Sequence, residues 1–156
     1  MISLQVSDRV SFPLSRAAQQ LADKEPVNRR ISIQLYGWTM RNFDVAGAMQ
    51  TPRWAPLSAR TLKEKARLGY SPQPLLRTGN LRQAFASYYD ANKGGIGARA
   101  SYFSGGKKFD YATVHQFGSE HIPARPMLPP PAYVRQTAIS IYGKFISDSM
   151  KGSKTQ

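Results

Sequence analysis

The sequence predicts an α+β fold in which an N-terminal strand and helices precede a central antiparallel hairpin and a long C-terminal helix. Three observations support this class. Apolar residues recur at helical spacing in two long segments, residues 27–43 and 132–150. A glycine-containing turn at residues 92–95 separates two strand-like segments, as in a β-hairpin. Five prolines within residues 122–131 exclude helix and central strand there, so that backbone must be extended.

Length and composition favour one domain made in a reducing compartment. At 156 residues the chain fits a single domain, which we expect to span residues 1–150 and to be followed by a flexible polar tail, residues 151–156. Cysteine is absent, which excludes disulfides, thiolate zinc sites and cysteine nucleophiles. The start of the chain lacks a signal-peptide pattern and no apolar stretch has the length of a membrane span, so we expect an unexported chain without membrane contact.

Period-2 and helical spacing predict the N-terminal elements. Apolar and polar residues alternate over residues 2–6, which predicts a short strand. Helical spacing predicts a helix over residues 13–23 and, after the break at Pro26, a longer helix over residues 27–43. The longer helix carries an apolar stripe that we place in the core: Val27, Ile31, Leu35 and Trp38, extended by Tyr36, Met40 and Phe43.

The middle of the chain is predicted to hold short elements joined by loops. Residues 44–53 show no period and indicate a long loop. A short helix should begin at Ser58 or Thr61, because Thr61 with a glutamate three residues later matches a capping box. Glycine and proline then break the chain over residues 69–74. Thr78 is expected to cap the next turn.

The second half should contain the hairpin and the last helix. Segments 84–90 and 96–103 are expected to pair, and residues 104–108 to form a polar loop. Asp110 should cap a short helix that Gly118 ends. The last helix, residues 132–150, places Val134, Ala138, Ile141 and Phe145 on one stripe, with Ile139, Tyr142 and Ile146 beside it.

Charge is the strongest compositional signal. With 22 Lys and Arg against 9 Asp and Glu the formal net charge is +13. Such a field favours contact with a polyanion or an acidic protein surface, although a merely solvated basic surface is an equal alternative. The candidate DNA-facing or partner-facing residues are Arg60, Lys63, Lys65, Arg67, Arg77, Arg82, Lys107 and Lys108.

These basic residues are expected to act as a diffuse surface, because they are spread over a helix, a turn and a hairpin. Any DNA binding should then be weak, indifferent to base sequence and sensitive to salt. Charge reversal at Lys63, Lys65 and Arg67 should weaken it without unfolding the protein.

Three stretches, read in order, form a more specific signal over residues 54–128. Their defining residues are Trp54, Pro56, Leu57 and Thr61; Leu76, Thr78, Gly79 and Leu81; and Tyr111, His115, Gln116, Gly118, Pro123, Arg125 and Pro126. In this order, with a glycine hairpin between the second and the third, they resemble the phage virion morphogenesis family, the Mu-like tail completion or neck proteins of tailed bacteriophages. The first fifty residues match that family only in having helices.

The resemblance implies a small α+β structural protein of the virion, at or near the head–tail junction, assembled in the host cytoplasm. It implies self-association into a ring, here expected to hold six copies. The implied partners are neighbouring connector, tail terminator or tail tube proteins and genomic DNA that passes without sequence recognition. It implies no catalysis and no cofactor.

Several motif residues have physical interpretations of their own. Trp54 and Leu57 should plug the core. Arg125, held between two prolines, is the best candidate for a carboxylate contact, within the subunit or between subunits. His115 and His121 lack a metal-ligand spacing and no cysteine can complete a set, so a hydrogen-bonded structural His115 is favoured over metal binding.

Two rival functions come from other classes. A nucleic-acid-binding regulator would explain the charge, but the sequence shows no helix–turn–helix spacing, no zinc finger and no RNP-like aromatic strand. A hydrolase or metalloenzyme would need a cluster of catalytic residues, and neither a GxSxG motif nor a working pair of acids is present.

Overall fold

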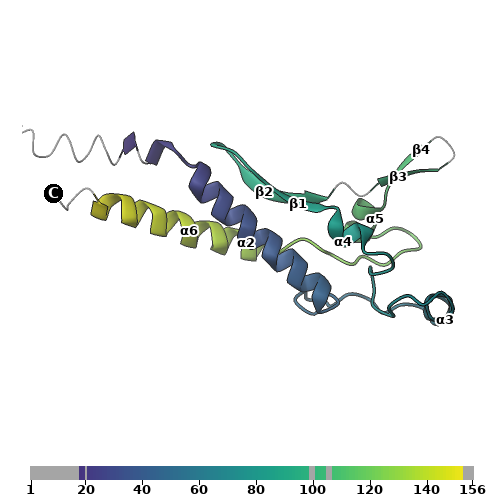
Figure 1. Ribbon diagram of the computed structural model, residues 1–156. Coiled ribbons are helices and arrows are strands. Elements are labelled where there is room, and N and C mark those ends of the chain that lie inside the picture. Colours follow the sequence, from purple (N-terminus) through teal and green to yellow (C-terminus); the bar gives the residue numbers. More distant parts are fainter. Residues whose placement is uncertain (1–17, 20, 99–100, 105–106, 153–156) are drawn as a thin grey trace, which may run out of the picture.

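A computed structural model describes residues 18–19, 21–98, 101–104 and 107–152 (Figure 1). For residues 101–104, 107–109 and 152 it describes the backbone alone. The predicted N-terminal strand lies outside the described residues, as does most of the predicted helix over residues 13–23. The predicted α+β class is confirmed, with helices, paired antiparallel strands and a long C-terminal helix.

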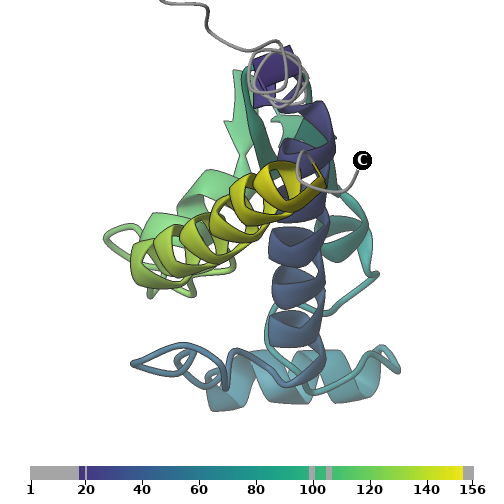
Figure 2. The ribbon, with the colours of Figure 1, turned by 90° about the vertical axis from the view of Figure 1, so that its left-hand side faces the viewer.

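The fold is organised around helix α2 (Glu25–Asp44), on which two other elements pack. The hairpin of β1 (Phe85–Tyr89) and β2 (Gly94–Ala98) lies along α2, and helix α6 (Pro131–Gly152) crosses it (Figures 1 and 2). Both long helices lie where the periodicity predicted them. No helix of the described residues is long and apolar enough to cross a bilayer.

One apolar cluster joins α2 to α6 and β2. Val27, Ile31 and Leu35 are its buried centre on α2, as the predicted stripe requires. Burying side chains of this size stabilises a fold by about 1.5–3 kcal/mol each, so this contact is a main source of stability. The partly buried residues packed on it are Ile96, Tyr133, Val134, Ala138, Ile141, Tyr142 and Phe145.

A second cluster lies at the other end of α2, where the loops converge. Phe43 is its aromatic centre, in edge-on contact with Trp54 at 5.4 Å and with Phe85 at 5.7 Å between ring centroids. Helix α4 (Asn80–Gln83) and helix α5 (Tyr111–Phe117) contribute to it as well. The buried members are Phe43, Trp54, Leu81, Phe85, Ala112 and Met127.

The predicted hairpin forms, but its second strand is shorter than expected. Strand β1 begins at Phe85, directly after α4, and Phe85 pairs with Ala98. Because the segment before Phe85 is helical, β1 offers no residue for pairing beyond Ala98. The following residues pair elsewhere instead: β3 (Ser101–Ser104) forms a second hairpin with β4 (Lys107–Asp110), where the sequence had indicated a polar loop.

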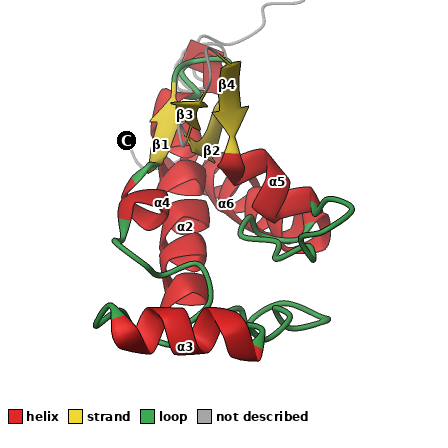
Figure 3. Cartoon of the chain, turned by 90° about the vertical axis from the view of Figure 1, so that its right-hand side faces the viewer, coloured by secondary structure: helices red, strands yellow, loops and turns green. Residues whose placement is uncertain are grey.

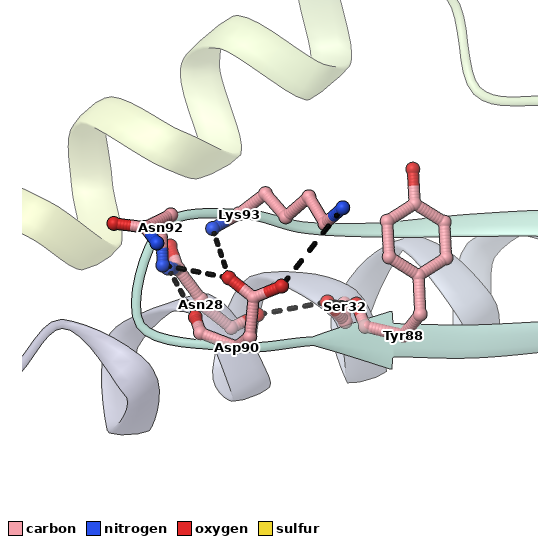
Figure 4. A network of polar contacts seen from close by, with 6 residues as sticks. All are labelled: Asn28, Ser32, Tyr88, Asp90, Asn92 and Lys93. Carbon is pink, nitrogen blue, oxygen red and sulfur yellow. Dashed lines mark hydrogen bonds and ion pairs between the residues drawn. The ribbon is translucent and has the colours of Figure 1, made fainter.

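Polar side chains of α2 hold the turn of the first hairpin (Figure 4). The Asn28 amide donates to the Asp90 carbonyl at 2.8 Å, and the Ser32 hydroxyl lies 2.8 Å from the Tyr88 carbonyl. A Cβ at Gly94 would lie 2.5 Å from the Asn28 carbonyl oxygen, so the close approach requires glycine. Tyr142 of α6 donates to Asn28 at 2.8 Å, and one asparagine therefore links three elements.

Helix α3 (Ala59–Arg67) lies beyond the C-terminal end of α2 and runs crosswise to it, with loops between them (Figures 1 and 3). The predicted capping box is wrong: Ser58 is the cap, since its hydroxyl accepts from the Thr61 amide at 3.2 Å. The predicted cap of α5 is confirmed, because Asp110 accepts from the Thr113 amide at 3.1 Å, and Gly118 ends that helix with φ +81°.

Candidate functional site: a junction of three motifs

The three sequence motifs, distant along the chain, meet in one place that we call the motif junction. It consists of residues 54–57, residues 75–82, helix α5 and the extended segment 123–128. The extended segment forms hydrogen bonds with residues 54–56, with α5 and with the end of α2. Because its backbone groups have no strand partner, side chains and loop backbone satisfy them.

Trp54 anchors the first motif. Its ring is 6 % exposed and its indole N–H donates to the Pro126 carbonyl at 2.6 Å, so the predicted core role of Trp54 is confirmed. Leu57 is only partly buried. The ring packs against Gly47, whose φ is +77° and where a Cβ would lie 2.2 Å from Trp54 Cγ. Glycine at 47 is therefore part of the tryptophan site.

Arg125 joins the third motif to the first by hydrogen bonds. Its guanidinium donates from Nε to the Ala55 carbonyl at 2.9 Å and from Nη2 to the Pro56 carbonyl at 3.1 Å. The backbone N–H of Arg125 donates to the His115 carbonyl at 2.7 Å. Within the subunit the expected carboxylate contact is therefore wrong, because these donors bond loop carbonyls that Pro56, Pro123 and Pro126 hold extended. A carboxylate contact with a neighbouring chain stays a prediction.

Amide side chains complete the junction. The Gln116 side-chain oxygen accepts from the Met127 and Leu128 amides at 2.8 and 3.2 Å, and the Gln50 amide donates to the Leu128 carbonyl at 2.8 Å. A Cβ at Gly118 would lie 2.9 Å from the Ala124 nitrogen, which explains glycine there. Gln50 was missed by the sequence analysis, because a glutamine in an aperiodic loop carries no signal.

The second motif builds α4 differently from its prediction. The N-cap of α4 is Gly79, in the left-handed region at φ +83°, and Thr78 makes no capping bond. Only glycine adopts this conformation without strain, so it takes the place of the threonine cap. Leu81 is buried in the second cluster, and the Leu76 carbonyl accepts a hydrogen bond from Lys65.

Lys65 is the largest departure among the predicted basic residues. It was expected on the exposed face of α3, but it is 7 % exposed, and its ammonium donates to the Gln73 and Leu76 carbonyls at 2.6 and 2.8 Å. Burial, together with the nearby Arg77, lowers the pKa of Lys65. The side chain of Lys65 therefore holds α3 to the loop that follows it by two hydrogen bonds.

Among the other predicted basic residues whose side chains are described, two are paired. Arg77 lies 3.6 Å from Glu64 and stacks over Tyr70, and Arg82 lies 2.8 Å from Asp44. Exposed pairs of this kind contribute little to stability. Arg60, Lys63 and Arg67 are exposed on the outer face of α3, and Lys107 and Lys108 belong to β4.

His115 lies at the centre of the junction, and His121 is exposed. The Nδ1 atom of His115 is buried and has no hydrogen-bond partner among the described residues, so the predicted side-chain hydrogen bond is not found at that atom. Burial, and secondarily Arg125, lowers the pKa of His115. Within the described part of the chain, no three His, Asp or Glu side chains lie close enough to hold a metal ion.

His115 should make the protein sensitive to acid. Because folding lowers its pKa, the unfolded chain binds a proton first, so stability is full above about pH 6.5 and falls as the pH drops below it. His115→Gln should therefore reduce the loss of unfolding free energy between pH 7.5 and pH 5, measured by urea titration. His121→Gln is the matched control, and an equal reduction there would contradict the assignment.

The polar side chains of the junction hold its loops together by hydrogen bonds. Its charged and amide groups are directed at backbone carbonyls and amides, which positions three segments rigidly.

A family model described as the phage virion morphogenesis family matches residues 6–142. The protein "Mu-like prophage FluMu G protein 2" of Haemophilus influenzae is 30 % identical over 137 residues, which are 82 % of this chain and 83 % of that protein. No solved structure matches significantly.

Proposed function

This chain belongs to the phage virion morphogenesis family, and from that premise we propose that it is a structural subunit of the head–tail junction. Copies of the chain form a ring of six that completes the tail or joins it to the head and lets the genome pass. Connector, tail terminator or tail tube proteins dock on the faces of this ring. The subunit acts by geometric fit and not by catalysis.

The observation that carries self-association is an exposed apolar stripe on α6. Ile139, Ile146 and Met150 are 66, 44 and 58 % exposed, and their spacing places them on one side of the helix. Gly143 lies beside the stripe, and a Cβ there would meet no atom within 4 Å, so a second backbone has room to approach. Apolar side chains gathered on one exposed face indicate a contact surface.

Strand edges offer a second means of association. Within the described residues, β1 pairs only with β2, and β3 only with β4, so no further strand covers either hairpin, while Ser32 of α2 bonds the Tyr88 carbonyl of β1. Open edges expose unpaired N–H and C=O groups that a neighbouring chain can satisfy. The side chains of β1 after Phe85 are exposed, which leaves that edge accessible.

The basic outer face of α3 suits the passage of DNA. Arg60, Lys63 and Arg67 are exposed there, and in a ring they would supply a sequence-independent field for the phosphate backbone. Phosphate contacts of this kind carry no sequence information. A preference of about a thousandfold for one short DNA sequence at physiological salt would instead favour the regulator.

The proposal predicts a closed oligomer that dissociates when charged residues replace the apolar stripe on α6. Native mass spectrometry of the purified protein should give six times the chain mass, and the protein should be detected in mature virions. Ile139→Lys with Ile146→Lys should give monomers, because two ammonium groups would be buried at the contact.

Ser140→Lys with Ser147→Lys is the matched control, since both serines are exposed on a neighbouring side of α6 and the charge change is identical. This variant should keep the oligomer. A wild-type protein that stays monomeric at all concentrations, or that is absent from virions, would overturn the proposal.

A further inference from the structure

A groove of about 620 Å³ separates α3 from the motif junction. One face of α3 forms its first wall, and the loop after α3, the start of α4 and the third motif form the other. Its aliphatic lining consists of Leu57, Leu68, Leu75, Leu76 and Leu81, and the rings of Tyr70 and Tyr111 line it as well. All three motifs that carry the family resemblance contribute residues to this groove.

Two buried cations lie among these leucines. Lys65 and Arg125 both line the groove and are 7 and 6 % exposed. Their side chains donate hydrogen bonds to four backbone carbonyls, and neither makes an ion pair within the described residues. The acidic residue of the lining, Glu64, is exposed and lies beside Arg77 at the rim. The described groove therefore has more cations than anions.

This charge excess is unfavourable in the free protein. Taking a cation out of water costs several kcal/mol, and a carbonyl dipole offsets less of that cost than an anion does. The pKa values of Lys65, His115 and Arg125 are all lowered, chiefly by burial, as expected where positive charge lacks a negative partner. A carboxylate brought into the groove would offset this cost and add charge-assisted hydrogen bonds.

We propose that this groove binds an apolar segment of a partner protein through a carboxylate that reaches Lys65 and Arg125. The leucine walls fit aliphatic or aromatic side chains on either side of the acid. A second copy of this chain fits less well, because it carries 9 acidic against 22 basic residues. Nucleic acid fits less well too, since five leucines line the groove against two tyrosines, and Arg77 already stacks over the ring of Tyr70. The inference goes beyond the ring and does not depend on it.

The test begins with a random dodecapeptide library selected on the full-length protein. We expect enrichment of peptides in which Asp or Glu is flanked by Leu, Ile or Phe. The strongest peptide is then measured by fluorescence anisotropy beside its Asn or Gln counterpart, which should bind at least about tenfold more weakly, a loss of about 1.4 kcal/mol or more. Binding should also raise the pKa of His115, followed by NMR, because an anion would enter its surroundings.

Helix α3 and the loop that follows it provide matched pairs of variants. Arg77→Glu charges the groove rim and Arg67→Glu the opposite face of α3, with the same change of net charge, so only the first should weaken peptide binding about tenfold or more. Leu68→Ser and Leu62→Ser form the apolar pair, at residues 42 and 40 % exposed, and only Leu68 lines the groove. These residues are exposed, so the variants should fold.

Each contrary result has a distinct meaning. No enrichment of acidic, apolar peptides overturns the proposal. Equal weakening by Arg67→Glu and Arg77→Glu would show that the peptide is held by diffuse electrostatic attraction and not by the groove. Displacement of the peptide by short duplex DNA would show that the groove binds nucleic acid and not a protein partner. Loss of the native oligomer in Leu68→Ser would show that a second copy of this chain occupies the groove. A failed ring test with intact peptide binding leaves this site standing.

Discussion

Trp54→Ala should destabilise the protein by about 3–5 kcal/mol, as expected for removing a buried tryptophan. The ring fills the space between Phe43 and Gly47, so its removal leaves a cavity. The substitution also removes the indole N–H that the Pro126 carbonyl accepts, which loosens the segment that holds Arg125. Both effects have the same sign.

Guanidinium titration followed by circular dichroism would measure this loss. Phe117→Ala is the control, because Phe117 is 75 % exposed and its loss should cost less than about 0.5 kcal/mol. Trp54→Phe separates the two effects, since it keeps most of the packing and loses only the hydrogen bond, at about 1–3 kcal/mol. A midpoint for Trp54→Ala equal to that of the wild type would contradict the role given to this ring.

Periodicity predicted the long elements correctly, because burial on one side of a helix is written directly into residue spacing. Val27, Ile31 and Leu35 on α2, and the facing stripe on α6, needed no further information. The cap at Asp110 and the end at Gly118 were also predictable, since a short side chain or a left-handed turn suits few other residues.

The polar interior of α2 could not be predicted. Ser32, Thr39 and Asn42 are fully buried, yet in sequence they resemble the polar face of an amphipathic helix. They are buried because the hairpin and segment 123–128 cover α2 from sides that its own sequence does not identify. Thr39 Oγ1 and Asn42 Oδ1 have no hydrogen-bond partner within the described residues. Neither the spacing of these residues nor a partner side chain could therefore indicate their burial.

The motifs indicated which residues meet but not how. Trp54 was placed correctly because a large ring between prolines has few other uses. Arg125 was expected to find a carboxylate, whereas the carbonyls of Ala55 and Pro56 lie where only the folded chain can bring them. Pairing across a sequence distance of about seventy residues depends on the whole fold, which explains why the site was harder to predict than the helices.

Lys65→Glu should cost more than about 3 kcal/mol, in contrast to the sequence-based expectation that charge reversal on α3 is harmless. A carboxylate at this position would face the Gln73 and Leu76 carbonyls with no donor between them. Lys65→Met keeps the apolar stem and loses the two hydrogen bonds, so we expect an intermediate loss of about 1–3 kcal/mol. Thermal and guanidinium unfolding would rank the three proteins.

Lys63→Glu is the control for Lys65→Glu, because it makes the same change of charge on the same helix at an exposed residue, and it should alter stability by less than about 0.5 kcal/mol. Equal unfolding midpoints for the two variants would show that Lys65 is solvated and not a link between α3 and the loop. The distinction decides how the basic surface must be tested. Reversal at Lys63 and Arg67 changes the outer face of α3 alone, whereas any set that includes Lys65 would confuse lost DNA binding with lost structure.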